Sequence, residues 1–224
     1  MTTFFLVRHG ETDWNATGRW QGYADIPLNE DGRAQARRLA ARLRREAVRF
    51  DAIYTSDLQR SAETASLVGA ALGLSPQPLA ALREIDVGLW SGLTVQEVRA
   101  QHGQLLARLE SGEDLPRGGT GERFADLYDR VVPAVEQLAA RHPRGVVGLF
   151  SHGGPVRALL LYAARENHRA PVRKLHIGNT SLSVLTYDER GWNLPLINDM
   201  SHLAAGPHAP DMMSAPPDDA ERPL

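Results

Sequence analysis

Short apolar segments alternate with amphipathic segments along most of the chain. Continuous apolar runs lie at Phe4–Val7, Ala52–Thr55 and Gly145–Phe150, and runs of this length are typical of strands buried on both faces. Apolar residues recur at helical spacing over about 33–49, 58–72, 94–110 and 122–141. Strands and helices that alternate in this way form parallel sheets with crossover helices. We therefore expect a three-layer α/β/α fold with a mostly parallel central sheet.

The C-terminal part of the chain shows a different pattern. A further helix is expected from Pro155 to about Ala164. Ser181–Tyr187 and Trp192–Ile197, separated by a polar turn, predict a hairpin at one edge of the sheet, which could pair across a homodimer. We expect one α/β domain over residues 1–204, with an insertion at about 90–124, and a disordered tail rich in Pro and Asp over 205–224.

Composition excludes several classes of protein. The 224 residues include no cysteine, so disulfides, thiolate metal sites and cysteine nucleophiles are absent. No segment is apolar enough to span a membrane or to act as a signal peptide, and we expect a cytoplasmic protein. Lys174 is the one lysine among 25 basic residues. The arginines on one face of the helix at 33–49 are interpreted as a solvated surface rather than a nucleic-acid site.

Two apolar strands end abruptly in histidine. Arg8 and His9 follow the first strand and His152 follows the third, and each histidine is succeeded by glycine. Ligands of parallel sheets bind outside the carboxyl ends of the strands. The glycines that follow, Gly10, Gly153 and Gly154, would let backbone N–H groups approach an anion closely. The pattern predicts an oxyanion site.

Arginines and one carboxylic acid extend this site. Arg8 and Arg60, which follows the second strand, are suited to bind a phosphoryl group through their forked guanidiniums. Glu84 lies between hydrophobic neighbours that would raise its pKa, so it is a candidate to protonate a departing alkoxide. Asp86, two residues on, is expected to be a cap or a supporting group.

Other chemistries fit the sequence less well. A metal site at His9 and His152 would need a third ligand of suitable spacing, and none accompanies them. Ser151 lacks the spacing of a hydrolase nucleophile elbow, and the chain has no Walker glycine-lysine motif. We expect the six remaining histidines to lie on the surface: His102, His142, His168, His176, His202 and His208.

Five separated motifs resemble those of the histidine phosphatase superfamily, in its phosphoglycerate mutase-like branch. In order they are LVRHGETDWN, QGYADIPLNEDGRAQA, YTSDLQRSAETA, LREIDVGLWSGLT and FSHGGPVRALL. The resemblance extends from Phe4 to about Thr186 and implies the phosphoglycerate mutase-like fold. It also implies a phosphohistidine on His9, proton donation by Glu84, and no metal or cofactor.

The resemblance also assigns the residues that bind substrate. It implies a phosphate pocket of Arg8, Asn15, Arg60 and His152. Gln21 and Gly22 match positions that contact phosphate or substrate, and Gly153 would add a backbone N–H group. The implied partner is a small phosphorylated metabolite.

The interval after the acid distinguishes two activities of this family. Mutases resemble one another in a longer insertion there, whereas 68 positions separate Glu84 from His152 (152 − 84). We therefore expect a phosphatase of small phosphate monoesters, with a cofactor-dependent phosphoglycerate mutase as the alternative. A catalytically silent binding module is a third reading. Trp90, Leu93, Leu109 and the segment Leu115–Phe124 are expected to form a lid over the leaving group.

Overall fold

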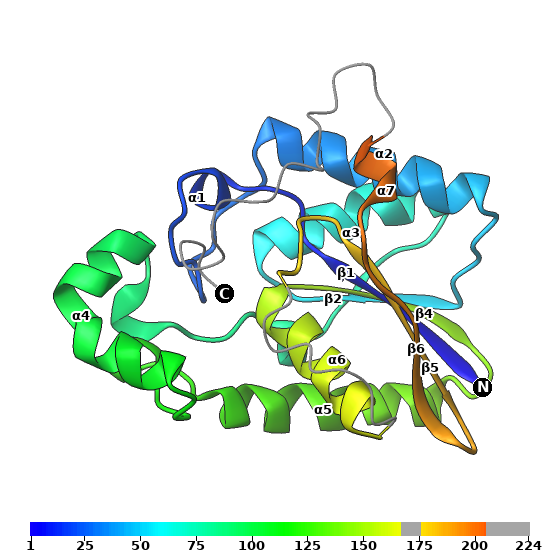
Figure 1. The fold of residues 1–224 in the computed structure, drawn as a ribbon. Helices are drawn as coiled ribbons and strands as arrows, with labels where there is room; N and C mark the ends of the chain where they lie inside the picture. Colours follow the sequence, from blue (N-terminus) through cyan, green and yellow to red (C-terminus); the bar gives the residue numbers. More distant parts are fainter. Residues whose placement is uncertain (167–175, 205–224) are drawn as a thin grey trace.

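A six-stranded sheet with the order β3-β2-β4-β1-β5-β6 forms the centre of the molecule (Figure 1). The computed structural model describes residues 1–166 and 176–204. The strands are β1 (Thr2–Arg8), β2 (Ala52–Thr55), β3 (Gln77–Pro78), β4 (Val146–Ser151), β5 (Leu182–Asp188) and β6 (Gly191–Asp199). β1 to β4 are mutually parallel, and β5 and β6 add an antiparallel hairpin at one edge. The mostly parallel sheet with an edge hairpin confirms the sequence-based expectation.

Helices cover both faces of this sheet. The helices are α1 (Asp13–Ala16), α2 (Glu30–Arg45), α3 (Gln59–Leu72), α4 (Val95–Glu110), α5 (Phe124–Arg141), α6 (Gly153–Glu166) and α7 (Ser201–Ala204). Single 3₁₀ turns lie at η1 (Ala80–Leu82), η2 (Gly88–Trp90) and η3 (Arg117–Gly119). In Figure 1, α2 and α3 lie on one face, and α5 and α6 lie on the other. The three layers predicted from the sequence are therefore present.

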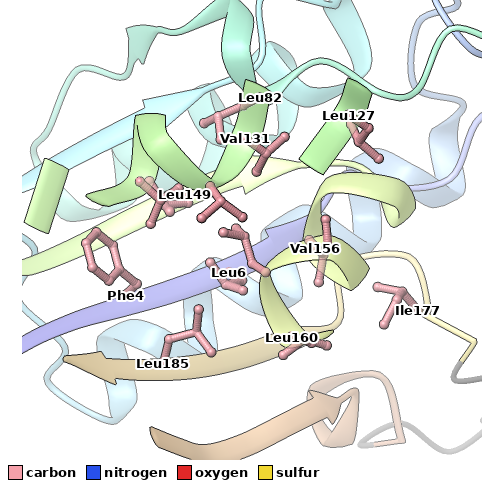
Figure 2. Packing of buried hydrophobic residues seen from close by; sticks show 14 of the residues in the cluster. Phe4, Leu6, Leu82, Leu127, Val131, Leu149, Val156, Leu160, Ile177 and Leu185 are labelled. Atoms are coloured by element: carbon pink, nitrogen blue, oxygen red, sulfur yellow. The ribbon is translucent and has the colours of Figure 1, made fainter. Parts of the chain in front are cut away.

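Alternation along the strands produces two hydrophobic cores. Phe4 and Leu6 of β1 face α5 and α6, where they pack with Leu149 of β4 (Figure 2). Val7 points to the opposite face and packs with Leu39 and Leu43 of α2. Because successive side chains of a strand point to opposite faces, an all-apolar strand is required where both faces are covered. This explains the unbroken run at the start of the chain.

Several boundaries differ from the prediction for local reasons. The two-proline stretch Ser75–Leu82, whose sequence indicates an extended connection, contains β3, which pairs with β2 over only two residues. α1 was not predicted because four residues are too few for a periodic signal; its signature is the capping box of Thr12 and Asn15. α6 begins at Gly153, ahead of Pro155, since the first turn of a helix needs no partner for the proline nitrogen. The tail over 205–224 lies outside the described residues.

The segment 88–124 stands apart from the three layers. It contains η2, α4 and η3, and α4 lies beyond the edge of the layered body in Figure 1. Its attachment includes the backbone hydrogen bond from Trp20 N to Leu93 O, at 2.9 Å. Trp90 is buried against Trp20, with ring centroids 5.2 Å apart. The expectation that Trp90 covers a ligand is therefore wrong, because its ring belongs to the core.

Across residues 1–166 and 176–204, no helix has the length and apolar character needed to cross a membrane.

Gly10 lies where β1 meets the first turn of α2. A Cβ atom at Gly10 would sit 2.5 Å from the carbonyl oxygen of Gly32. The Gly10 amide donates to Thr64 Oγ1 at 3.0 Å. The space beside Gly10 is thus filled by α2 rather than left for an anion, which corrects the expectation from the sequence. Close packing of two backbones fixes the exit of the chain from β1.

We expect Gly10→Ala to lower the free energy of unfolding by about 1–3 kcal/mol, because the added methyl group must displace backbone. Urea unfolding checks this. Gly103→Ala is the matched control: nothing lies within 4 Å of its added Cβ, so it should raise stability by about 0.5–1 kcal/mol as a helix substitution. Equal stability of Gly10→Ala and the wild type would refute the packing argument.

Candidate active site

The register of β1 against β4 brings the two motif histidines together. Arg8 pairs with Ser151 at the carboxyl ends of the two strands. The His9 amide donates to Ser151 O at 2.9 Å. The residue after the last residue of each strand is a histidine, and the imidazole centroids of His9 and His152 lie 5.1 Å apart. Residues 143 positions apart (152 − 9) thus meet at one point of the sheet edge.

A pocket opens at this point, with about 290 Å³ of space that includes part of its mouth. Seven of the predicted site residues line it: Arg8, His9, Asn15, Gln21, Gly22, Arg60 and Glu84. Arg19 lines it as well and was not predicted. His152 and Gly153 are not among the lining residues, and both are buried.

The environment of His9 favours a neutral imidazole with one defined proton. Nδ1 lies 2.6 Å from the carbonyl oxygen of Gly10. A carbonyl only accepts hydrogen bonds, so Nδ1 carries the proton and Nε2 keeps its lone pair. Burial, and then the charges of Arg60 and Arg8, hold the pKa of His9 well below its usual value. His9 therefore has the protonation state that a nucleophile needs.

Arg60 connects three parts of the site. It is fully buried at the start of α3. Its Nη1 and Nη2 atoms donate to the carbonyls of Ala24 and Gly22, at 2.7 and 2.8 Å, and Nε donates to His152 Nδ1 at 3.2 Å. Burial lowers the pKa of Arg60 to about 10, so it stays charged at neutral pH.

His152 is held in one tautomer by its neighbours. Because Nδ1 accepts from Arg60, the proton of the neutral ring is on Nε2, which lies 2.8 Å from Ser56 Oγ. Burial, followed by the charge of Arg60, holds the pKa of His152 well below its usual value. The position of His152 is therefore suited to orient Arg60 and to support the ring of His9.

Glu84 lies in a setting that favours the carboxylic acid. Its Oε1 atom accepts from the amides of Ile85 and Gly154, at 2.9 and 3.0 Å. Burial raises the pKa of Glu84, and the amides and nearby arginines only partly offset this. A Cβ at Gly154 would lie 2.4 Å from Oε1, so this glycine permits the contact. Asp86 accepts from the Gly88 amide at 2.9 Å and serves as a cap.

Asn15 and Gly22 shape the rest of the pocket wall. The Asn15 Oδ1 atom accepts from the Thr12 amide at 3.2 Å, which leaves its Nδ2 donor for the pocket. Gly22 has a φ of +52°, and a side chain there would strike the backbone of Val87 at 2.9 Å. Only glycine fits this turn without strain. Arg8 donates to the carbonyl of Ile177, which draws β1 toward the chain before β5.

Sequence reasoning missed the residues that hold the backbone of the site. The Thr180 amide donates to the carbonyls of Arg8 and His9, at 3.1 and 3.2 Å, and Asn179 Nδ2 donates to His9 O at 3.0 Å. Thr180 acts through its main-chain amide and Asn179 through its side-chain amide, and neither contact leaves a periodic signal in the sequence. Thr180 Oγ1 in turn lies 3.0 Å from His202 Nε2.

His202 corrects an expectation, because the sequence suggested a surface residue. It is buried, and burial lowers its pKa to about 4. Among the described residues, no group of three or more histidine, aspartate or glutamate side chains is placed to hold a metal ion. His168 and His208 lie outside the described residues.

Proteins of known family resemble this chain in sequence. The sequence profile of the histidine phosphatase superfamily (branch 1) matches residues 4–200. Phosphoglycerate mutase-like protein 4 of Arabidopsis thaliana is 36% identical over 204 residues, covering 88% of this chain and 85% of that protein. The metal-independent phosphoserine phosphatase of Arabidopsis thaliana is 36% identical over 208 residues, covering 92% and 84%.

A solved structure gives the same result for the fold. The mycobacterial glucosyl-3-phosphoglycerate phosphatase, solved in complex with VO3, superposes with a TM-score of 0.77 at 31% identity. The superposition covers 88% of this chain and 98% of that one. The fold and the paired histidines define a phosphoglycerate mutase-like α/β protein. The chain belongs to the histidine phosphatase superfamily, as its five motifs indicated.

The buried histidines make stability depend on pH. Their folded pKa values lie below the usual 6.5, so the unfolded chain binds more protons below that pH. Stability is then complete above pH 6.5 and falls as pH drops, by up to about 1.4 kcal/mol per pH unit for each histidine. Glu84 has the opposite effect, because its pKa is raised above 4.5 and the folded protein then binds the extra proton. Its effect is the smaller one, since it concerns one proton and the histidines concern three.

We therefore expect the free energy of unfolding in urea to be lower at pH 5.5 than at pH 7.5. His202→Gln, which can keep a hydrogen bond to Thr180, should reduce this loss of stability by the part that comes from protonation of one histidine. Stability that is equal at the two pH values would contradict the neutral assignment of these rings.

Proposed function

We propose that this protein hydrolyses small phosphate monoesters through a phosphohistidine formed on His9. One observation carries the proposal: a buried, neutral His9 shares a pocket with Arg8, Arg60 and a carboxyl group of raised pKa. A nucleophile, an electrostatic cradle and a proton donor are the parts that phosphoryl transfer needs. The phosphatases among the relatives support the same reaction.

The phosphate group would be bound by hydrogen-bond donors, and the position of Arg60 among them is fixed before the substrate binds. Arg8 and Arg60 supply positive charge on two sides of the pocket, and Asn15 Nδ2 and Gln21 add neutral donors. Arg60 is already immobilised by two carbonyls and His152, so binding costs it little conformational entropy. His152 and Gly153 do not line the pocket. Their support of the proposal is indirect, through the orientation of Arg60 and the start of α6.

The first half-reaction transfers the phosphoryl group to the protein. His9 Nε2 attacks phosphorus and forms an N–P bond as the ester P–O bond breaks. The proton on Glu84 passes to the departing alkoxide, so the alcohol leaves neutral and Glu84 becomes a carboxylate. Nδ1 of His9 keeps its hydrogen bond to Gly10 O throughout, which holds the imidazole in line and stabilises the charge that it gains.

The second half-reaction returns the protein to its starting state. Glu84, now ionised, takes a proton from water as the oxygen attacks phosphorus. The N–P bond breaks, its electron pair returns to Nε2, and inorganic phosphate leaves. The short interval between Glu84 and His152 remains our reason to favour water over a second substrate as the acceptor.

The domain organisation completes the proposal. Within the insertion at about 90–124, Leu93, Leu109 and the segment Leu115–Phe124 would act as a lid, and the rest of residues 1–204 would form one catalytic domain. A cytoplasmic location, and a homodimer formed along β6, remain predictions from the sequence.

The nucleophile has a direct test. We expect His9→Ala to lower hydrolysis of p-nitrophenyl phosphate, and of a panel of sugar, glycerate and nucleotide phosphates, by about 10⁴-fold or more. Released phosphate measures the rate. His142→Ala, a histidine whose ring contacts Tyr54, is the matched control and should keep activity. A brief reaction of the wild type should also trap acid-labile, base-stable phosphate on the protein.

Each alternative predicts a different result in the same assay. Conversion of 3- to 2-phosphoglycerate without net phosphate release would identify a mutase. A folded wild type without activity on any ester would indicate a binding module. Hydrolysis without trapped phosphate would argue against the covalent intermediate.

The acid has a test that separates it from general damage. Glu84→Gln preserves the acceptor for Ile85 and Gly154 but cannot donate the same proton. In single-turnover experiments, we expect it to slow transfer from an alkyl phosphate by about 10²–10⁴-fold. Transfer from p-nitrophenyl phosphate, whose leaving group departs without a proton, should slow far less. Equal losses on the two substrates would contradict the role of Glu84 as general acid.

A further inference from the structure

Arg19 is the one pocket-lining cation that the proposed reaction leaves unused. It shares the pocket with His9, Arg8 and Arg60. Its side chain is 38% exposed, whereas Arg60 is fully buried. Arg8 and Arg60 already provide two guanidiniums for one phosphoryl group. Arg19 is therefore a further positive charge on the solvent side of the pocket.

The backbone and one carbonyl hold Arg19 in place. Its amide donates to Trp14 O at 2.8 Å, and a β-bridge joins it to Thr94, just before α4. Nη1 donates to the carbonyl oxygen of Gly92 at 2.7 Å. Among the described contacts both side-chain hydrogen bonds use Nη1, so Nε and Nη2 remain as a parallel pair of donors. This is the edge with which a guanidinium binds a carboxylate bidentately.

The ion pair of Arg19 is weak enough to be exchanged. Its partner, Glu97 Oε2, lies 3.4 Å from Nη1 and its side chain is 45% exposed. That same oxygen accepts from the Thr94 amide at 2.7 Å and so closes the capping box of α4. Exposed pairs with long contacts contribute little. An incoming anion can thus bind Arg19 while Glu97 keeps its role as a cap.

We infer that Arg19 determines specificity by binding a second negative charge on the alcohol part of the substrate. The substrates then are small phosphorylated carboxylic acids, preferred over phosphate esters of neutral alcohols, and Glu97 competes with their carboxylate. This inference rests on the proposed function for the placement of the phosphoryl group beside His9.

Two ligands that share a three-carbon skeleton test this inference. 3-Phosphoglycerate carries a carboxylate where glycerol 3-phosphate carries a hydroxymethyl group. Their inhibition constants are measured against p-nitrophenyl phosphate hydrolysis, so neither needs to be turned over. We expect the wild type to bind 3-phosphoglycerate about tenfold or more tightly than glycerol 3-phosphate, because a charge-assisted hydrogen bond is at stake.

The variants divide the effect between residues. Arg19→Gln should bring the ratio of the two constants close to one, and Arg19→Lys should keep part of it. Glu97→Gln, which retains the helix cap, should increase the ratio by about two- to threefold. Arg99→Gln alters an exposed arginine of α4 that does not line the pocket and pairs with Glu110 at 3.7 Å, and it should leave the ratio unchanged.

Two results would overturn the inference: a wild type that binds both ligands equally, or an Arg19→Gln variant with the wild-type ratio. Circular dichroism confirms that each variant is folded. A wild type that does not hydrolyse p-nitrophenyl phosphate would instead count against the proposed function. The same two ligands are then titrated by calorimetry, and their ratio of dissociation constants decides the role of Arg19 independently.

Discussion

The pairing of β1 with β4 is the interaction on which the rest of the molecule depends. A slip of one residue would turn Phe4 and Leu6 away from α5 and α6, since side chains of a strand alternate between faces. It would also separate His9 from His152. The hydrophobic core and the position of the two histidines therefore depend on the same set of hydrogen bonds between β1 and β4. Burial of apolar strands thus fixes the relative positions of His9 and His152.

Loops from distant parts of the chain are attached to this frame by a few buried polar groups. Arg60 ties the loop at Gly22 and Ala24 to His152, and Thr180 ties the chain before β5 to the end of β1. Such groups are costly to bury unless their hydrogen bonds are made. Here the partners are mostly main-chain carbonyls, which side-chain substitution cannot remove. The arrangement fixes the Arg60 guanidinium through three hydrogen bonds, while the lining of the pocket stays polar.

Much of the fold could be predicted from the alternation of apolar strands with amphipathic helices, and His9 and Arg60 could be predicted because they follow predicted strands. Asn15, Gln21 and Gly22, by contrast, were predicted only from the resemblance of their motifs. β2 was predicted with its observed bounds, and His9, Arg60 and Glu84 stood next to recognisable elements. Other features depend on neighbours that no local pattern reveals. Trp90 is buried by Trp20, 70 positions away (90 − 20), and His202 by α2 and Thr180. No sequence pattern singled out Arg19, and its place in the pocket lining became evident only from the structure.

The neutral histidines have a wider consequence for how the site responds to acidity. All fixed positive charge in the pocket belongs to arginines, and even Arg60, whose pKa is about 10, is ionised throughout the neutral range. In the proposed reaction, the electric field on a bound phosphate would then stay constant while protons move. Changes of rate with pH would report on Glu84 and on the ligand's own ionisation. The proposed reaction thus assigns attraction of the substrate to the arginines and its chemical conversion to His9 and Glu84, which are different groups.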